Sequence, residues 1–232
     1  MAFSSVPRSL ALIPDGNRRW AKAHRLSMME GYDKGVKKFL DFSEWCKSYG
    51  VRNITVWALS SENIRRSPGE VKALFGIYRR VCKDREIIER LQREGVRLNI
   101  ISNKKLLPQD LNRALADLAS KTRENKERVI NMLIGYGGKD DLIFAAKKAV
   151  GLAKKGVNLD ANRFTECLLS NEVPDIDFII RTSGEKRLSG FIPWQAAYSE
   201  LYFSSKLWPD FSRHDLYNAL SEYQSRERRF GR

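Results

Sequence analysis

Cysteine and histidine are scarce in this 232-residue chain, and their scarcity argues against two kinds of site. The three cysteines, Cys46, Cys82 and Cys167, are odd in number and far apart, which fits neither a disulfide framework nor a cysteine metal site. The two histidines, His24 and His214, are too few for a histidine-based metal centre. We therefore expect three reduced thiols, as in a cytosolic protein.

Long apolar runs and known phosphate-binding signatures are also missing. No stretch approaches the ~20 apolar residues that a helix needs to cross a bilayer. The first nine residues lack the basic start and apolar run of a signal peptide. Neither G-x-x-x-x-G-K-S/T nor G-x-G-x-x-G occurs. The sequence predicts a soluble, cytoplasmic protein whose contact with a membrane is at most peripheral.

Positive charge is what the chain has in excess. Its 42 lysines and arginines outnumber its 28 acidic residues, which gives a formal net charge of +14. A nucleic acid, an anionic membrane surface and a phosphate-bearing small molecule would all suit such a chain, and so would a plain solvated surface. Charge alone does not choose among them.

Short apolar runs alternate with longer segments of helical periodicity. This alternation predicts an α/β fold in one domain spanning residues 1–232, with a mainly parallel six-stranded sheet flanked by helices. Ligands of such sheets bind beyond the carboxyl ends of the strands. Strands are predicted at residues 10–13, 54–59, 96–101, 128–134, 177–180 and 201–203, and helices at 32–49, 68–94, 108–124, 138–154, 161–170 and from about 212 onward.

Helix ends carry recognisable signals. Ser67 followed by Glu70, and Ser212 followed by Asp215, have the spacing of capping boxes. The pair Asp140–Asp141 opens a predicted helix, and we interpret it as negative charge at the helix N-terminus.

Polar residues gather after three of the predicted strands. Residues 15–20 (DGNRRW) place a carboxylate beside a helix start, which suits Mg²⁺ and phosphate, although a turn with a helix cap gives the same pattern. Residues 60–66 (SSENIRR) suit a phosphate pocket or a solvated loop. Residues 181–189 (RTSGEKRLS) combine three cations with three hydroxyls, as in a phosphate clamp or a basic surface loop. The basic tail, residues 226–232, is typical of a solvated terminus.

Taken together, these segments resemble the cis-prenyltransferases, which include undecaprenyl and dehydrodolichyl diphosphate synthases. The matching segments run in order along nearly the whole chain. Besides DGNRRWA (15–21), SSEN (60–63) and RTSGEKR (181–187), they are WQAAYSELYF (194–203), LWPDF (207–211) and RFG (229–231). The forms with Arg18 and Ser183 resemble archaeal and eukaryotic members.

The resemblance implies a homodimer with a hydrophobic product tunnel and Mg²⁺ as cofactor. The reaction it implies is condensation of isopentenyl diphosphate onto an allylic diphosphate of C10 to C20, giving a longer polyprenyl diphosphate. Transient contact with a membrane surface fits an amphipathic product, and no nucleic acid is expected.

By position, the resemblance assigns catalytic roles to Asp15, Asn63 and Ser60, and Mg²⁺ binding to Asp15 and Glu200. Asn63 and Ser60 are placed for diphosphate departure and proton removal. Arg229 and Gly231 match a terminal R-x-G motif that reaches the neighbouring active site of the dimer. The substrate-binding residues it implies are Gly16, Asn17, Arg18, Arg19, Trp20, Arg66, Arg181, Arg187, Ser189, Arg229 and Gly231.

Two positions depart from the family pattern. Met28 stands where an arginine that binds the allylic diphosphate is usual, and Tyr32 stands where a histidine is usual. This predicts an unusual acceptor or product, unless Arg18 or Arg25 replaces the missing arginine. Two other functions stay open: a non-catalytic subunit of a prenyltransferase complex, and a basic nucleic-acid-binding protein.

Overall fold

A six-stranded parallel sheet forms the centre of the computed structural model, which describes residues 3–226. The strand order is β3-β4-β2-β1-β5-β6, and every pairing is parallel, as the alternating pattern predicted. The strands are β1 (Ser9–Ile13), β2 (Asn53–Ser60), β3 (Val96–Ile101), β4 (Arg128–Tyr136), β5 (Phe178–Arg181) and β6 (Glu200–Phe203).

The chain reverses its direction of travel across the sheet between β1 and β5. From β1 it continues to β2 on one side, whereas from β5 it continues to β6 on the other side. Open parallel sheets bind ligands at such a switch point, beyond the carboxyl ends of the strands. Asp15 follows β1 and Arg181 ends β5, so two predicted site residues meet there.

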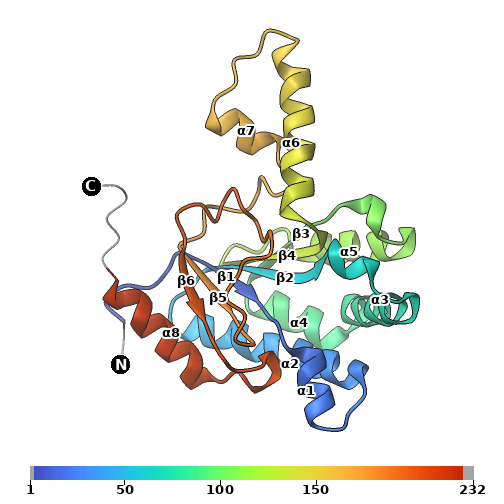
Figure 1. The fold of residues 1–232 in the computed structure, drawn as a ribbon, viewed down its shortest axis with the longest axis vertical. Helices are drawn as coiled ribbons and strands as arrows, with labels where there is room; N and C mark the ends of the chain where they lie inside the picture. Colours follow the sequence, from blue (N-terminus) through green and yellow to red (C-terminus); the bar gives the residue numbers. More distant parts are fainter. Residues whose placement is uncertain (1–2, 227–232) are drawn as a thin grey trace.

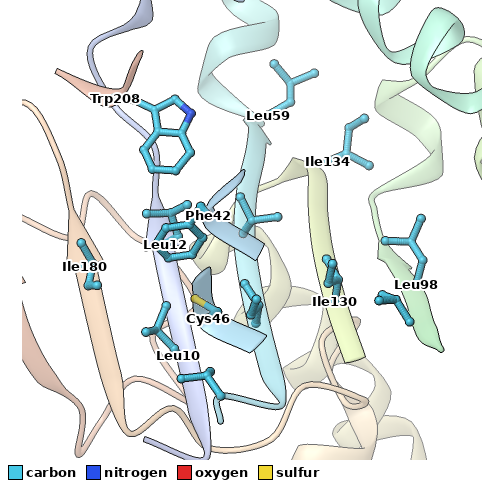
Figure 2. Packing of buried hydrophobic residues seen from close by; sticks show 14 of the residues in the cluster. Leu10, Leu12, Phe42, Cys46, Leu59, Leu98, Ile130, Ile134, Ile180 and Trp208 are labelled. Carbon is cyan, nitrogen blue, oxygen red and sulfur yellow. The ribbon is translucent and has the colours of Figure 1, made fainter. Parts of the chain in front are cut away.

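Helices cover mainly one face of the sheet, where the largest core cluster lies. Figure 2 shows Phe42 and Cys46, from α2, over Leu10 and Leu12 of β1. Trp208 completes this packing, with its ring centroid 5.6 Å from that of Phe42. The helices are α1 (Asn17–Ala23), α2 (Met28–Ser48), α3 (Pro68–Lys83), α4 (Arg85–Arg93), α5 (Gln109–Thr122), α6 (Gly138–Ala153), α7 (Ala161–Cys167) and α8 (Arg213–Ser225).

The opposite face of the sheet is covered mainly by irregular backbone. Buried side chains of the largely irregular segment 168–199, including Val173, Ile176 and Phe191, pack there against Ala11 and Leu133. Apolar side chains can shield a strand face without a regular helix, because burial depends on the area removed from water.

The long helix predicted at residues 68–94 is interrupted at Asp84. This residue has extended backbone angles, ends α3 and caps α4, because its carboxylate accepts a hydrogen bond from the Ile87 N–H at 3.1 Å. Aspartate competes with helix hydrogen bonds in this way. The predicted start of α2 was also wrong by one turn, since Ser27 and Glu30 form a capping box ahead of it.

Helix α6 extends away from the sheet, with α7 beside it (Figure 1). We call α6 and α7 the arm. Its base is fixed by Asp141, which is only 1% exposed. The Asp141 carboxylate accepts hydrogen bonds from Tyr136 Oη at 2.9 Å, Leu169 N at 2.6 Å and Ser170 Oγ at 2.6 Å. Asp141 lies in the first turn of α6 as predicted, and it also ties the helix to residues 169 and 170, which the sequence did not indicate.

Candidate active site

A cavity of about 700 Å³ opens beyond the carboxyl ends of β1, β2 and β5. It continues over the helix-covered face of the sheet toward the starts of β3 and β4. We call its polar opening the mouth and its apolar continuation the tunnel. Of the predicted site residues, the following line this one cavity: Asp15, Gly16, Asn17, Arg18, Arg19, Ser60, Asn63, Arg66, Arg181, Arg187 and Ser189.

Asp15 is held at the mouth by two arginines. Arg181 Nη2 donates to Asp15 Oδ2 at 2.9 Å, and Arg19 Nη2 lies 3.8 Å from Asp15 Oδ1. The Asp15 main-chain carbonyl accepts hydrogen bonds from Thr182 Oγ1 at 2.7 Å and Trp208 N at 3.0 Å. The backbone is thereby fixed while the carboxylate stays partly exposed.

The loop after β5 arranges further cations around the same space. Arg181, whose side chain is 6% exposed, donates from Nη1 to Ser189 Oγ at 3.0 Å and to the Arg187 carbonyl. Glu185 pairs with Arg187 at 2.5 Å and with Arg19 at 3.6 Å. The arginines that resemble a phosphate clamp therefore line the same mouth and are paired there with carboxylates.

Ser60 and Asn63 meet at the carboxyl end of β2. Ser60 Oγ accepts a hydrogen bond from Asn63 N at 3.1 Å, and both residues line the cavity. The pairing of β2 with β4 shifts register between Trp57 and Leu59 and again before Ser60. Such irregularities redirect side chains near sites, and this one lies directly before Ser60.

A second ionic group lies where α2 and α3 approach α1. Glu70 Oε1 accepts hydrogen bonds from Arg66 Nη1 at 2.7 Å and Tyr32 Oη at 3.1 Å, and Arg18 lies 3.4 Å from Glu70 Oε2. Burial raises the pKa of Tyr32 to about 12, with the Glu70 charge adding to the shift and Arg66 opposing it. Tyr32 is therefore neutral at physiological pH.

Glu70 contacts three residues of the cavity lining, a role that the sequence did not indicate. Its spacing from Ser67 predicted a capping box, but only half of that motif forms: Ser67 Oγ accepts from the Glu70 N–H at 3.4 Å. The Glu70 carboxylate instead contacts Arg18, Tyr32 and Arg66. Glu185 was also missed as a partner of the clamp arginines.

One wall of the tunnel is formed mainly by alternate residues of neighbouring strands, with Trp57 of β2 also lining the cavity. Val56 and Ala58 come from β2, Val96 and Leu98 from β3, and Ile130 and Met132 from β4, as expected for side chains on one face of a sheet. The opposite wall consists of apolar residues from the covering helices: Val36, Phe39, Leu40, Leu74, Ile77, Val81, Ile87, Leu91 and Leu118.

Three residues singled out in the sequence lie away from the cavity. Trp20 is buried, stacks on His24 with ring centroids 4.1 Å apart, and donates to Asp210 Oδ1 at 2.6 Å. Met28 begins α2 outside the cavity lining. Glu200 begins β6 and does not line the cavity either.

Glu200 is far from Asp15 within one chain. Leu10, Phe178 and Glu200 lie at one level of the sheet, and Asp15 lies five residues beyond Leu10, roughly 16 Å farther at 3.3 Å per residue. The Glu200 carboxylate pairs with Arg226 at 2.6 Å. Arg229 and Gly231, which match the terminal motif, fall outside the described residues.

The carboxylates of Asp15, Glu62 and Glu185 line the cavity near the carboxyl ends of the strands, and Asp15 is the one that the resemblance assigns to a metal ion. In residues 3–226, no group of three or more histidine, cysteine, aspartate or glutamate side chains is arranged for metal binding. Mg²⁺ prefers oxygen ligands and commonly uses one or two carboxylates together with substrate phosphates and water. Asp15, partly exposed and lining the cavity, fits that pattern. The same described part of the chain contains no helix long and apolar enough to cross a membrane.

Comparison with known proteins gives the same result over the full length of the chain. A family model described as putative undecaprenyl diphosphate synthase matches residues 13–231. An isoprenyl transferase of Thermus thermophilus is 40% identical, with 98% of this chain and 89% of the relative covered. A tritrans,polycis-undecaprenyl-diphosphate synthase (geranylgeranyl-diphosphate specific) of Thermoplasma acidophilum is 39% identical, with 97% and 89% covered.

A solved structure is also similar. The crystal structure of lavandulyl diphosphate synthase from Lavandula x intermedia, in complex with dimethylallyl diphosphate, aligns with a TM-score of 0.92 at 32% identity. The alignment covers 98% of this chain and 99% of that chain. The sequence motifs, the fold and these matches agree, and the chain belongs to the cis-prenyltransferase family.

Proposed function

We propose that this prenyltransferase condenses isopentenyl diphosphate onto an allylic diphosphate of C10 to C20 and so makes a longer polyprenyl diphosphate. The observation that carries the proposal is the single cavity that joins a mouth rich in arginine to an apolar tunnel. A prenyl diphosphate has the same two parts, a polyanionic head and a hydrocarbon tail. Hydrocarbon gains free energy on leaving water, whereas diphosphate needs cations and hydrogen-bond donors.

Two sets of residues are available for two diphosphates. On the allylic side, Gly16, Asn17, Arg18, Arg19 and Arg66 line the mouth beside the tunnel. On the isopentenyl side are Arg181, Arg187 and Ser189. Among the described residues, the buried Arg181 Nε has no hydrogen-bond partner, which leaves a charged donor for a phosphate oxygen.

In the proposed reaction, the allylic carbon–oxygen bond breaks as the isopentenyl double bond forms a new carbon–carbon bond. Diphosphate leaves, the methyl-bearing carbon of the isopentenyl unit becomes cationic, and a proton is lost from the CH2 group between it and the carbon that carries the diphosphate. The arginines at the mouth stabilise the negative charge that grows on the leaving diphosphate. Ser60 and Asn63 are placed to orient that group and to assist proton removal.

Asp15 would hold Mg²⁺ together with diphosphate oxygens. Bound there, the ion would neutralise charge on the leaving group as a Lewis acid. Asp15 now pairs with Arg181, so metal binding and the arginine clamp share one carboxylate. Glu200 can join this site only from a second copy of the chain or after a large rearrangement, because it begins β6 at the other end of the sheet.

A homodimer, with the R-x-G tail and Glu200 serving the partner's site, is therefore part of the proposal. The arm supports it, since Ile143, Phe144 and Val150 on α6 are 55%, 45% and 55% exposed. Exposed apolar groups gathered on one helix suit a protein–protein interface. The particle mass in solution tests this association.

The acceptor depends on how this chain replaces the usual arginine and histidine. Tyr32 lines the cavity and is hydrogen-bonded to Glu70, whereas Met28 lies outside the lining. Arg18 lines the cavity and is the better substitute for the missing arginine, because Arg25 does not line it. We keep the hypothesis of an unusual acceptor or product, which ordinary binding and ordinary product lengths across an acceptor panel would remove.

The decisive experiment measures incorporation of labelled isopentenyl diphosphate with Mg²⁺ and C10, C15 or C20 allylic diphosphates, with products separated by length. We expect a Mg²⁺-dependent ladder that falls at least about 100-fold in Asp15→Ala, since electrostatic stabilisation of the leaving group is lost. Asp33→Ala is the matched control, because that carboxylate is 46% exposed and pairs with Arg80 outside the cavity.

No ladder with any acceptor would favour the alternative of a non-catalytic subunit. A gel-shift assay with strong salt dependence would favour nucleic-acid binding. The present arrangement speaks against that function, because Arg18, Arg19 and Arg181 line a cavity and pair with carboxylates. Cytoplasmic location and transient membrane contact stay predictions from the sequence.

A further inference from the structure

The far end of the tunnel is ionic. Arg90, near the end of α4, and Glu94, which caps that helix, line the cavity beside Leu91 and Val96. Arg128, the first residue of β4, lies behind them and pairs with Glu94. We call Arg90, Glu94 and Arg128 the tunnel floor.

The floor and the mouth lie at opposite edges of the sheet. Leu12, Val56 and Met132 occupy one level across three strands. Asp15 lies three residues beyond that level and Arg128 four residues before it. These seven positions correspond to roughly 23 Å at 3.3 Å per residue.

The floor is held by hydrogen bonds among its three side chains, although the buried Arg128 Nε has no partner among the described residues. Arg90 Nε donates to Glu94 Oε1 at 2.8 Å, and Arg128 donates to Glu94 Oε2. Arg128 Nη1 also donates to the Ser43 carbonyl at 2.8 Å. The side chains are 24%, 15% and 6% exposed for Arg90, Glu94 and Arg128.

Arg90 connects the floor to the protein surface. Its Nη2 donates to the Leu40 carbonyl at 3.2 Å and to Glu44 Oε2 at 2.8 Å. Glu44 is 65% exposed. The guanidinium of Arg90 therefore stands between the apolar tunnel and solvent, with α2 on one side and α4 on the other.

Hydrocarbon and paired charge affect a growing tail in opposite ways. Each unit that enters the apolar tunnel leaves water, which favours further growth. A tail end that reaches the floor meets charged side chains that are already paired with one another. Pushing past them would strip a buried charge of its partner, which is strongly unfavourable.

We propose that the tunnel floor limits the length of the prenyl tail, with Arg90 as the residue that closes the tunnel. The inference rests on the proposed function, because the tail in question belongs to the proposed product. It assigns a specificity-determining role to an ion cluster that is otherwise an anchor of α4 to β4 and α2. A pure anchor would affect stability without changing which tails fit.

Arg90→Met separates these two roles. Methionine keeps an unbranched apolar side chain, and Glu94 keeps its pair with Arg128, so no buried charge is left alone. Arg85→Met is the matched control, with the same change on the same helix at a side chain that is 91% exposed and outside the cavity lining. Arg90→Lys restores a cation and should restore the limit.

The first readout needs no turnover. Equilibrium binding of prenyl diphosphates with tails from C15 to C40 is measured without isopentenyl diphosphate. We expect affinity for the unsubstituted chain to rise with tail length and then level off or fall. We call the tail length at which affinity stops rising the break. In Arg90→Met the break should move to tails longer by one or more isoprene units. It should not move in Arg85→Met or Arg90→Lys.

The second readout is the product ladder, whose longest members should shift by the same number of units. If the break is unchanged in Arg90→Met and binding is normal, the tunnel floor does not limit tail length, and the proposal of chain elongation is unaffected. If the break shifts in Arg90→Met but no product ladder forms with any of the proteins, the role of the tunnel floor is supported and the proposal of chain elongation is contradicted. If no prenyl diphosphate binds the wild-type protein, both proposals are wrong.

Discussion

At the scale of single residues, Gly16 connects backbone geometry with the mouth of the cavity. Its φ of 110° lies in the region that favours glycine, and it turns the chain from Asp15 into α1. A Cβ at this position would lie 2.9 Å from Leu207 Cδ2 and 3.1 Å from Leu207 Cα. Both the conformation and the space therefore require glycine between the carboxylate and Asn17.

Gly16→Ala should lower the free energy of unfolding by about 1–3 kcal/mol, because the alanine is strained and contacts Leu207 backbone. Urea denaturation measures this change. Gly76→Ala is the control: a methyl group added to this α3 glycine would meet nothing within 4 Å, and alanine there should stabilise by about 0.5–1 kcal/mol. Equal effects at the two positions would contradict the backbone argument.

At the scale of elements, Glu94 joins three segments that are distant in sequence. It ends α4, pairs with Arg90 of the same helix, and pairs with Arg128 of β4, which in turn donates to α2. Burial alone would raise the Glu94 pKa. The hydrogen bond from Arg90 and the charges of Arg90, Arg128 and Lys47 outweigh burial and hold that pKa below its ordinary value.

A lowered pKa in the folded state fixes the sign of the pH dependence. The stabilisation from ionised Glu94 is fully present above the ordinary pKa of 4.5 and is lost as the pH falls through the lowered folded value. Glu94→Gln should therefore lower the free energy of unfolding near pH 7, by about 3 kcal/mol, since it leaves Arg128 without its counter-charge. The difference from wild type should shrink below pH 4.5.

Unfolding by urea at a series of pH values measures this difference. Glu89→Gln is the control on the same helix, because Glu89 is 66% exposed and should change stability by less than about 1 kcal/mol. If the difference in free energy of unfolding between wild type and Glu94→Gln becomes larger at acidic pH, the predicted sign of the pH dependence is wrong.

At the scale of the whole molecule, the arm leaves apolar surface uncovered in a single chain. It extends from the sheet (Figure 1), and Ile143, Phe144 and Val150 of α6 are each about half exposed. The distance between Asp15 and Glu200 adds a second reason to expect two copies, if both carboxylates serve one site. Association through the arm would account for both features.

Phe144→Asp should convert a dimer of about twice 26.7 kDa into a monomer, because it places a charge on the apolar face of α6. Analytical ultracentrifugation measures the mass. Leu26→Asp is the control, since Leu26 is 39% exposed in the segment between α1 and α2, away from the arm. A monomeric wild-type protein, or a dimer that survives Phe144→Asp, would exclude this interface.

Local signals made a large part of the fold predictable. Apolar runs indicated where the six strands lie, and Ser212 with Asp215 forms the capping box expected at α8. The break at Asp84 was missed because helical periodicity continues across it, while the side-chain cap that interrupts it depends on one hydrogen bond. Asp141 lies in the first turn of α6 as predicted, but its hydrogen bonds to Leu169 and Ser170 were not predicted, because these partners are too far along the chain for any helical pattern to indicate.

The sequence by itself determined which residues follow the strands, and so brought Asp15, Ser60, Asn63 and Arg181 to one edge of a parallel sheet. It also carried the motifs of the family. Only the tertiary structure decided that Glu70 faces Arg66 and Tyr32, that Glu200 lies at the opposite edge from Asp15, and that the tunnel ends in charge. These features depend on strand order and on how helices pack across the sheet, and neither leaves a periodic signal in the chain.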